Sequence, residues 1–540
     1  MDFIFGTLAN DELKLVHHRV LRRGVQHHHD MTPLDPLPGE PVVITVRVGQ
    51  DIQADRVSLY YTTDGTSPAG WHGTVTNGLH LALEKVDLVW DTLAWAYLAI
   101  WRVTLPPQPE GTTVRYRISA WNSRDDTLDE VFADYPEFKA TTERAAAAFF
   151  RGEAIPADPP PALAKTDTFA YSVDRFHVPQ WARDAVIYQV FVDRFYPGHG
   201  QEWLQPDNLS GFYGGTLWGV RDQLDYIEAL GANCIWLSPT FPSPTHHGYD
   251  ITDYLHVEPR MGGDEALHAL VEAAHARGIR VLLDLVGNHI SKEHPYFIEA
   301  LNSPSSRYRD WFIFDDQDPI GYKTFFGVAT MPFINLNSPA ARAWMLDIAQ
   351  YWLREFDVDG YRLDHANGPG PDFWVDFRSA CRAVKPDSFS FGEVVEAPDI
   401  LRAYIGRLDG LLDFHMEDAL RRTFAYNTMT VSDFEAFVER HYAYFPHDFL
   451  LPTFLDNHDM DRFLFAANGD INALKRAAAA QMRLPQPPVI YYGTEVGLSQ
   501  ESGRKDGWGL EVSRLPMLWG DMQNRDLLAY YQKLIAERRR

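Results

Sequence analysis

Apolar and polar residues alternate in two stretches of the first 140 residues. Residues 42–48, VVITVRV, and residues 113–120, TVRYRISA, each carry an apolar side chain at every second position. A period of two places these side chains on one face of a β-strand. Turn-forming residues lie between the stretches, as in TTDGTSPAG at 62–70. The pattern predicts an N-terminal β-sandwich over residues 1–150.

After residue 180 the pattern changes to apolar strands that alternate with amphipathic helices. Residues 264–277 carry apolar side chains at helical spacing and stop before Gly278, which can adopt the left-handed conformation of a helix end. A second helix is expected to begin with Ser338 as its cap and Pro339 in its first turn. Strands that alternate with helices indicate an α/β architecture with a parallel sheet.

Eight strand-like segments argue for a closed barrel. They are VIYQVFV, NCIWLSP, RVLLDLV, DGYRLD, SFSFGEV, LDGLLDF, LPTFLD and PVIYYG. The predicted fold is a (β/α)8 TIM barrel over residues 180–540, joined to the sandwich by a proline-rich linker at 151–179. Residues 290–335, which follow the third strand, lack a regular pattern and predict a small inserted subdomain at the rim of the barrel.

Charge and cysteine usage narrow the class of protein. The chain of 540 residues has 74 acidic and 49 basic residues, a formal net charge of −25. This charge disfavours nucleic acid and anionic membrane surfaces as partners, and no apolar run is long enough to span a bilayer. The start lacks a secretion signal, and Cys234 and Cys381 show neither metal-ligand nor disulfide spacing. These features predict a cytoplasmic protein with two buried thiols.

Polar residues cluster where the predicted strands end. Arg362 and Asp364 lie two apart on one strand and so share a face, and other strand ends carry the segments DLVGNH (284–289), GEVV (392–395) and FLDNHD (454–459). A single charge at a strand end is more often structural, but several together in a cleft favour catalysis. An ionised carboxylate beside a protonated carboxylic acid suits glycosidic bond cleavage. Arg362 is expected to keep Asp364 ionised, and carboxylate neighbours to raise the pKa of Glu393.

On these segments the sequence resembles the α-amylase family of retaining glycoside hydrolases (family 13 type), over about residues 180–540. DLVGNH, GYRLDHA, GEVV and FLDNHD match its four main motifs in order, and MPFIN at 331–335 matches a fifth less closely. FYGGTLWGVRDQLDYIEALGANCIWLSP is most similar to the neopullulanase, cyclomaltodextrinase and maltogenic amylase group. Three departures are Gly368, where that group commonly has Glu, an N-terminal half without a matching motif, and an ending that resembles the last barrel helix, so that the usual C-terminal β-domain is expected to be absent.

The resemblance implies a role for each matching residue. Asp364 would be the nucleophile, Glu393 the general acid and then base, and Asp459 the carboxylate that steadies the distorted sugar. Asp284 would be structural. The implied substrate-binding residues are Tyr249, which stacks beneath the sugar, His289, His458 and Arg362. The implied activity is retaining hydrolysis of α-1,4 and sometimes α-1,6 bonds in an α-glucan or maltooligosaccharide, with the two reacting carboxyl groups about 5 to 5.5 Å apart.

Metal sites and aromatic platforms receive weaker support. The histidines lie on different strands without a paired spacing, which argues against a catalytic metal, and no cofactor is needed for the chemistry. A structural Ca²⁺ near Asn288 is implied by the resemblance alone. The run HHHD at 27–30 could ligate a metal but is expected to be exposed. Five tryptophans of the sandwich could stack on sugars but are expected to form core: Trp71, Trp90, Trp95, Trp101 and Trp121.

Two further functions stay open at this stage. A transglycosylase would share the glycosyl-enzyme and transfer it to another sugar instead of water. A non-catalytic glycan-binding protein could keep the same barrel, although the intact carboxylates disfavour it. By analogy with the resembled group, the sandwich could bind carbohydrate or form a homodimer.

Overall fold

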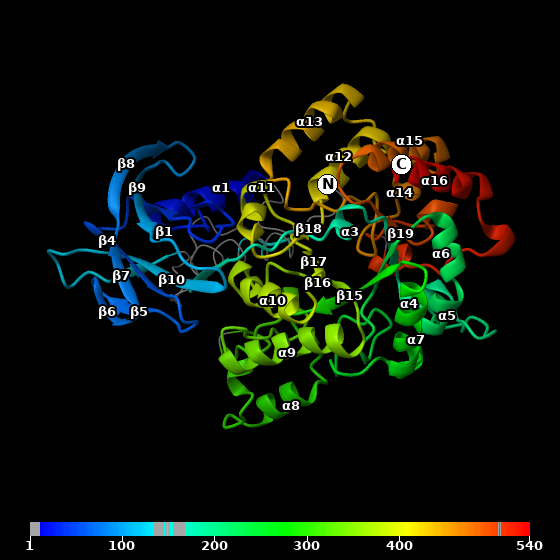
Figure 1. Ribbon diagram of the computed structural model, residues 1–540, viewed down its shortest axis with the longest axis horizontal. Coiled ribbons are helices and arrows are strands. Elements are labelled where there is room, and N and C mark those ends of the chain that lie inside the picture. The colour runs from blue at the N-terminus through cyan, green and yellow to red at the C-terminus, as the bar shows by residue number, and fades with distance from the viewer. Residues whose placement is uncertain are drawn as a thin grey trace.

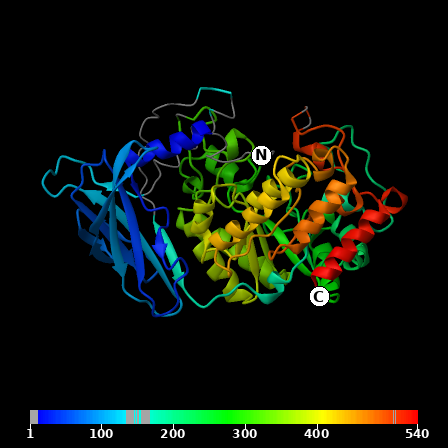
Figure 2. The same cartoon turned by 90° about the horizontal axis from the view of Figure 1, so that it is seen from above.

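The computed structural model describes residues 11–133, 168–316, 318–505 and 509–539, with positions 145, 148, 152–154 and 507. A β-sandwich lies at one end of the molecule and a barrel with its helices at the other (Figures 1 and 2). Of the predicted linker, residues 151 and 155–167 lie outside the described residues. Among those described, no helix combines the length and apolar character needed to cross a bilayer.

Two five-stranded sheets form the sandwich, and β5 and β6 pair as a separate two-stranded sheet. One has the order β1-β3-β9-β8, with β2 paired to β3, and the other has the order β11-β10-β4-β7, with β12 paired to β10. The strands are β1 (Val25–Gln26), β2 (Met31–Thr32), β3 (Val42–Gly49), β4 (Arg56–Thr62), β5 (Ala69–Trp71), β6 (Thr74–Asn77), β7 (Leu79–Ala82), β8 (Glu84–Asp91), β9 (Ala96–Leu105), β10 (Thr112–Trp121), β11 (Val131–Phe132) and β12 (Phe169–Val173). The alternating residues of β3 and β10 supply the core between the sheets, as their pattern predicts.

One strand of the sandwich comes from the segment assigned to the linker. β12 pairs antiparallel with β10, Tyr116 opposite Phe169, and all five of its residues are buried. The sheet therefore takes its last strand from residues 169–173, immediately before the barrel. The sandwich is therefore built from residues that precede the proline-rich stretch and from β12, which follows it.

The expectation that the tryptophans of the sandwich form core is wrong for three of them. Trp101 is buried, but Trp71, Trp90 and Trp95 are 53%, 43% and 67% exposed. β8 is the edge of its sheet and all but its last residue are exposed, so Trp90 and the β8–β9 turn carrying Trp95 are left uncovered. Strand position, which composition does not reveal, decides their burial.

The expectation of an exposed HHHD run is also wrong. His27 is fully buried, with Nδ1 2.8 Å from the Thr45 carbonyl oxygen and Nε2 2.7 Å from the Tyr116 hydroxyl. His29 lies 3.0 Å from Asp372 on the barrel. The run is held between the two bodies because it joins β1 and β2, which both pair with β3.

Seven strands of the barrel form one parallel sheet, in the order β18-β17-β16-β15-β14-β13-β19. They are β13 (Ile187–Val190), β14 (Cys234–Leu237), β15 (Arg280–Val286), β16 (Gly360–Asp364), β17 (Phe389–Gly392), β18 (Gly410–Leu411) and β19 (Val489–Tyr491). Parallel bridges from Gly410 to Leu450 and from Thr453 to Pro488 place residues 450–453 as the remaining strand. The sheet therefore closes into the predicted eight-stranded barrel, whose interior is packed with side chains such as Trp236, Leu282 and Phe391.

Helices surround the barrel and cap its rim. They are α3 (Gln180–Arg183), α4 (Val192–Phe195), α5 (Leu217–Asp222), α6 (Leu224–Leu230), α7 (Gly263–His275), α8 (Pro295–Asn302), α9 (Pro339–Glu355), α10 (Pro371–Val384), α11 (Pro398–Leu401), α12 (Phe414–Phe424), α13 (Val431–Tyr444), α14 (Phe463–Ala466), α15 (Ile471–Arg483) and α16 (Arg525–Arg538); α1 (Asp11–Val20) precedes the sandwich. Gly278 after α7 has a φ of 71°, as predicted. Ser338 precedes α9, but its hydroxyl donates to Asp310 instead of capping the helix.

The irregular segment after the third strand forms the predicted small subdomain. It contains α8 and two short 3-10 helices, η3 (Arg309–Trp311) and η4 (Phe325–Gly327). A bridge between His289 and Phe333 ties its far end to the residues that directly follow β15. The subdomain thus stands beside the rim of the barrel.

Candidate active site

A fully buried arginine organises the carboxyl groups at the rim. Asp284 on β15 and Arg362 on β16 are neighbours in the strand register, and Arg362 Nη1 donates to Asp284 Oδ1 at 2.8 Å. The same Nη1 donates to Asp364 Oδ1 at 2.8 Å. Trp236 Nε1 and the Tyr249 hydroxyl also donate to Asp284 Oδ2, at 3.1 and 3.0 Å. Asp284 therefore holds the guanidinium in place beneath Asp364.

Glu393 reaches the other side of the same guanidinium. Its Oε2 lies 2.6 Å from Arg362 Nη2 and accepts a hydrogen bond of 3.2 Å from the backbone N–H of His365. His365 follows Asp364 directly and has a φ of 40°, a left-handed conformation rarely adopted by residues other than glycine. The turn after β16 thus aims a backbone donor at Glu393. Asp364 and Glu393 converge on neighbouring nitrogens of one side chain.

The protonation of this cluster differs from the sequence-based expectation. Burial raises the pKa of Asp364 well above its usual value. The charge of Arg362 opposes this effect, whereas Glu393 and Asp284 add to it. Burial likewise raises the pKa of Glu393, against the opposing charge of Arg362. Arg362 favours the charged form of Asp364, as predicted, but burial and the neighbouring carboxyl groups outweigh it, so the pKa of Asp364 is raised. Three carboxyl groups share one arginine, so the buried cluster retains protons more readily than isolated carboxyl groups do.

Asp459 has a cation of its own. Its Oδ1 accepts a hydrogen bond of 2.8 Å from Arg514 Nη2, and His458 Nε2 lies 3.1 Å from Oδ2. Although burial raises the pKa of Asp459, His458 and Arg514 bring it below the usual value. Arg514 is positioned in turn by Glu511, at 2.9 Å from Nη1. Of the three predicted catalytic carboxyl groups, Asp459 is the one whose surroundings favour the charged form.

Tyr249 and His458 form a stacked pair beside these acids. Their rings are 5.3 Å apart and tilted by only 7°, and the Tyr249 hydroxyl lies 2.5 Å from His458 Nε2. Gln189 Nε2 donates to His458 Nδ1 at 2.8 Å, which leaves the proton of a neutral imidazole on Nε2. Burial lowers the pKa of His458 to about 3, so the ring is neutral at pH 7.

His289 presents an unused nitrogen. Its Nδ1 contacts Asn288 Nδ2 at 3.1 Å, whereas its buried Nε2 has no hydrogen-bond partner among the described residues. Burial lowers the pKa of His289 to about 3. Phe325 of the inserted subdomain stacks on the ring at 4.6 Å. A rigid neutral histidine with a free nitrogen can bind a hydroxyl group of a ligand.

Asn288, the predicted Ca²⁺ ligand, lies against Gly368. Among the described residues, no group of three or more His, Cys, Asp or Glu side chains is placed to hold a metal ion. A Cβ atom at Gly368 would lie 1.8 Å from Asn288 Oδ1, so glycine leaves room for this amide. Ca²⁺ prefers six to eight oxygen ligands, several of them carboxylates. The structure thus gives the Ca²⁺ prediction no support, and it stays a prediction.

The structure joins most of the residues predicted for the site and adds others. One connected network of hydrogen bonds and ion pairs joins seven residues: Asp284, Arg362, Asp364, Glu393, Tyr249, His458 and Asp459. His289 contacts Asn288 and Phe325 instead. Sequence reasoning missed Arg514, Glu511 and Phe325, which come from loops without regular periodicity. Their charges and aromatic rings were visible in the sequence, but only the folded loops show what they contact.

The barrel and the buried carboxyl groups at its rim place this protein in the class of (β/α)8 proteins with a carboxylate-lined site. Residues 189–526 match the model of the family described as alpha amylase, catalytic domain. The match covers more than half of the chain, which therefore belongs to the α-amylase family.

Individual relatives agree with this assignment. The chain is 40% identical to alpha-amylase 2 of Dictyoglomus thermophilum over 371 residues, 68% of this chain and 65% of that protein. It is 35% identical to an intracellular maltogenic amylase of Bacillus subtilis over 392 residues, 69% of this chain and 64% of the relative. A solved cyclomaltodextrinase superposes with a TM-score of 0.63 at 27% identity, covering 96% of this chain and 84% of that one. The chain thus matches about 65% of the length of these curated relatives and the fold of the solved structure, sandwich included.

Proposed function

We propose that this protein is a retaining glycoside hydrolase that cleaves α-1,4 bonds, and in some substrates α-1,6 bonds, of α-glucans such as maltooligosaccharides, cyclodextrins, pullulan or starch. The observation that carries the proposal is the convergence of Asp364 and Glu393 on one guanidinium at the barrel rim. Two carboxyl groups held close together leave little room for a water molecule between nucleophile and sugar, which favours a covalent intermediate.

In the proposed mechanism Asp364 attacks the anomeric carbon while Glu393 donates its proton to the departing glycosidic oxygen. This breaks the glycosidic bond and forms an ester between Asp364 and the sugar. Glu393, now a carboxylate, removes a proton from water, which attacks the ester and releases a product of retained configuration. Asp459, whose surroundings favour the charged form, stabilises the positive charge that develops on the sugar ring.

Four side chains are assigned to substrate binding. Tyr249 presents a fixed aromatic ring, and His289, whose buried Nε2 has no hydrogen-bond partner among the described residues, is assigned to a sugar hydroxyl. His458 is held by Gln189, so its orientation is set before the substrate arrives. Arg362 contacts both reacting carboxyl groups and positions them. Pre-organised groups of this kind lower the entropy lost on reaching the transition state.

The test is hydrolysis of maltotriose, β-cyclodextrin, pullulan and soluble starch by the wild type and by Glu393→Gln. We expect activity on at least one substrate, an α-configured first product by NMR, and a loss of about 10² to 10⁴-fold in the variant. No turnover of any substrate by the folded wild type would overturn the proposal in favour of a glycan-binding protein. Products longer than maltotriose would instead identify a transglycosylase, which shares the first half-reaction.

We also propose an intracellular location. It rests on the Bacillus subtilis relative, which is described as intracellular, and on the two free, buried cysteines of this chain. Fractionation of cells that express the tagged protein tests it, and recovery mainly from the medium would refute it.

We further propose that the sandwich mediates a homodimer through β8. This edge strand is exposed along its length and carries Leu88 and Trp90, which are 52% and 43% exposed. An edge strand offers unpaired backbone groups and here also apolar surface to a second copy. Sedimentation equilibrium should give a dimer that Leu88→Lys dissociates. The control Leu204→Lys changes a leucine of similar exposure in the barrel and should leave the mass unchanged.

A further inference from the structure

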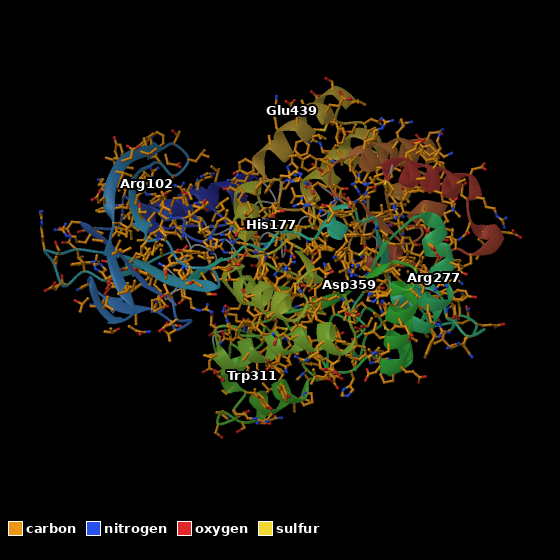
Figure 3. All side chains as sticks on the ribbon, in the orientation of Figure 1. Arg102, His177, Arg277, Trp311, Asp359 and Glu439 are labelled. Carbon is orange, nitrogen blue, oxygen red and sulfur yellow. The ribbon has the colours of Figure 1, made fainter. Side chains whose placement is uncertain are left out.

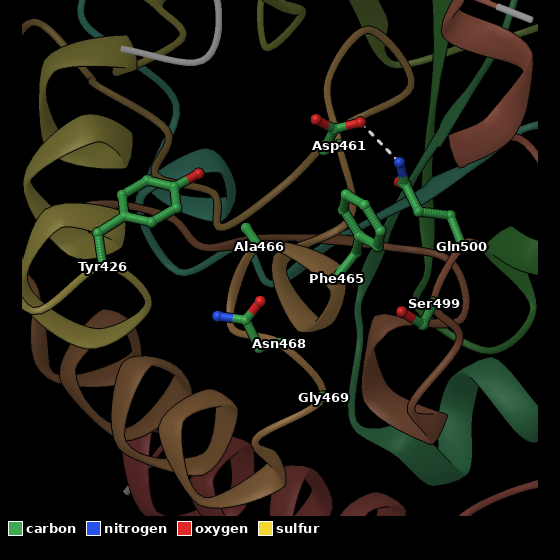
Figure 4. A pocket seen from close by; sticks show the side chains of 8 residues that line it. All are labelled: Tyr426, Asp461, Phe465, Ala466, Asn468, Gly469, Ser499 and Gln500. Carbon is green, nitrogen blue, oxygen red and sulfur yellow. Dashed lines mark hydrogen bonds between the residues drawn. The ribbon is translucent and has the colours of Figure 1, made fainter. Parts of the chain in front are cut away.

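A hollow of about 540 Å³ lies on the barrel, outside the cluster of catalytic acids. None of the three predicted catalytic carboxyl groups lines it. Its lining residues are Tyr426, Asp461, Phe465, Ala466, Asn468, Gly469, Ser499 and Gln500 (Figure 4). Its volume falls within the range of about 300–1,000 Å³ typical of small-molecule sites.

Three segments supply the hollow. Tyr426 comes just after α12, whose Arg421 donates to the Asp461 carbonyl oxygen at 2.5 Å. Asp461, Phe465 and Asn468 come from the segment after residues 450–453, and Ser499 follows β19. Segments that follow the strands of such a barrel lie at its C-terminal rim, where Asp364 and Glu393 also lie. The hollow is therefore on the same end of the barrel as the acids, and Asp461 follows Asp459 by two residues.

One wall of the hollow is held rigidly by Gln500. Its Nε2 donates to Asp461 Oδ1 at 2.6 Å and to the Ser502 carbonyl at 2.8 Å, while its Oε1 accepts from the Arg462 N–H at 2.7 Å. These bonds tie the loop after residues 450–453 to the loop after β19. The wall is thus formed before any ligand binds, which reduces the entropy cost of binding.

The remaining polar groups are unused. Tyr426, Asn468 and Ser499 make no side-chain hydrogen bond among the described residues, and the hydrogen bond marked in Figure 4 joins Gln500 to Asp461. Tyr426 and Phe465 add aromatic surface on either side of Asn468 in that view. The one charged group, Asp461, already accepts from Gln500 and from the Arg504 N–H. Free hydroxyl and amide groups between aromatic rings, without a cation, suit a neutral polyhydroxy ligand better than an anion.

We propose that this hollow is a second saccharide-binding site, which takes a segment of the α-glucan away from the bond being cleaved. The identity of the sugar as an α-glucan rests on the proposed function, whereas the neutral saccharide chemistry rests on the hollow itself. The aromatic rings pack against the apolar faces of the sugar, and Asn468, Tyr426 and Ser499 bind its hydroxyl groups. A site at the rim anchors a long chain so that the catalytic acids meet it more often.

Two substitutions can test the site without disturbing the fold. Tyr426→Ala removes a ring that is 37% exposed. Asn468 has a φ of 53°, so Asn468→Gly removes the amide and keeps the left-handed backbone. Tyr444→Ala is the matched control, because it removes a tyrosine ring of similar exposure, 42%, that does not line the hollow.

The experiment is affinity electrophoresis of the full chain in gels containing amylopectin, in the Glu393→Gln background so that nothing is hydrolysed. Tyr426→Ala and Asn468→Gly should each raise the dissociation constant for amylopectin at least threefold, whereas Tyr444→Ala should leave it at the parent's value. Thermal unfolding of each variant sets a gel temperature at which it is folded. Equal retardation of the parent and both hollow variants would overturn the proposal.

The outcome is separable from that of the proposed function. Retardation that depends on Tyr426 and Asn468, in a protein whose wild type hydrolyses no α-glucan, would support the second site and refute the hydrolase. Turnover by the wild type, with retardation unaffected by either substitution, would do the opposite. A threefold or larger loss of kcat/KM that is equal for maltotriose and starch would place these residues in the catalytic cleft and also overturn the second site.

Discussion

Asp284 and Arg362 lie 2.8 Å apart on adjacent strands, and neither side chain is exposed to solvent. Breaking a buried ion pair leaves a charge without its partner and costs about 3–5 kcal/mol. We expect Asp284→Asn to lower the free energy of unfolding by about 3 kcal/mol in urea titrations, because Arg362 keeps its contact with Asp364. Asp225→Asn, which breaks an exposed pair with Arg277, should cost less than about 1 kcal/mol. Similar losses for both variants would refute the structural role of the buried pair.

The same substitution should move the pH profile of activity. Hydrolysis requires Asp364 ionised and Glu393 protonated, and both pKa values are raised by burial and, in part, by Asp284. The acid limb of kcat/KM should therefore lie above the usual aspartate value of 3.8, and the alkaline limb above 4.5. Asp284→Asn removes one negative neighbour, so both limbs should shift to lower pH. A shift of either limb to higher pH would contradict this account.

Asp359, labelled in Figure 3, stabilises the opposite end of the barrel. Its buried carboxylate contacts His275 at 2.7 Å, Arg280 at 2.8 Å and Lys385 at 3.0 Å. Although burial opposes it, these partners lower the pKa of Asp359 from 3.8 to about 2. A depressed folded-state pKa contributes stability above the unfolded value of 3.8, and that stability is lost as pH falls towards 2.

We therefore expect Asp359→Asn to cost about 2 kcal/mol at pH 7. The difference from the wild type in urea unfolding should stay constant down to pH 5 and shrink below pH 4. A difference that grows on acidification would show that the wild-type carboxylate is not held in its charged form.

The sandwich is attached to the barrel through His29 and Asp372. His29 Nε2 lies 3.0 Å from Asp372, which also accepts a hydrogen bond of 2.5 Å from the Ala170 N–H on β12. Asp372→Ala leaves both donors unpaired and should cost about 1–3 kcal/mol. In calorimetry the sandwich should then unfold at a lower temperature, separated from the barrel. His177→Ala, at an exposed pair with Asp448, is the control and should leave the trace unchanged.

The eight barrel strands could be read from the chain because a strand buried on both faces needs a continuous apolar run, which survives in a single sequence. The acids of the site could be located for a related reason: they directly follow those strands. Protonation could not be obtained in this way. The pKa of Asp364 depends on how many other carboxyl groups share Arg362, and the strand register decides that number.

Loops and edges were the parts that sequence could not place. Arg514 lies in a loop without periodicity, so its contact with Asp459 becomes visible only once that loop is folded. Two residues of the sandwich show the same limit. Trp90 is apolar but exposed because it lies on an edge strand, whereas His27 is polar but buried because it bonds to both sheets.

By itself, the sequence determined the kinds of element, their order and the residues that carry the chemistry, since these depend on periodicity and on residue type. Only the tertiary structure decided which acid receives which cation, which aromatic rings face solvent and where a second ligand could bind. Those properties depend on distances between segments far apart in the chain, and local pattern contains no information about such distances.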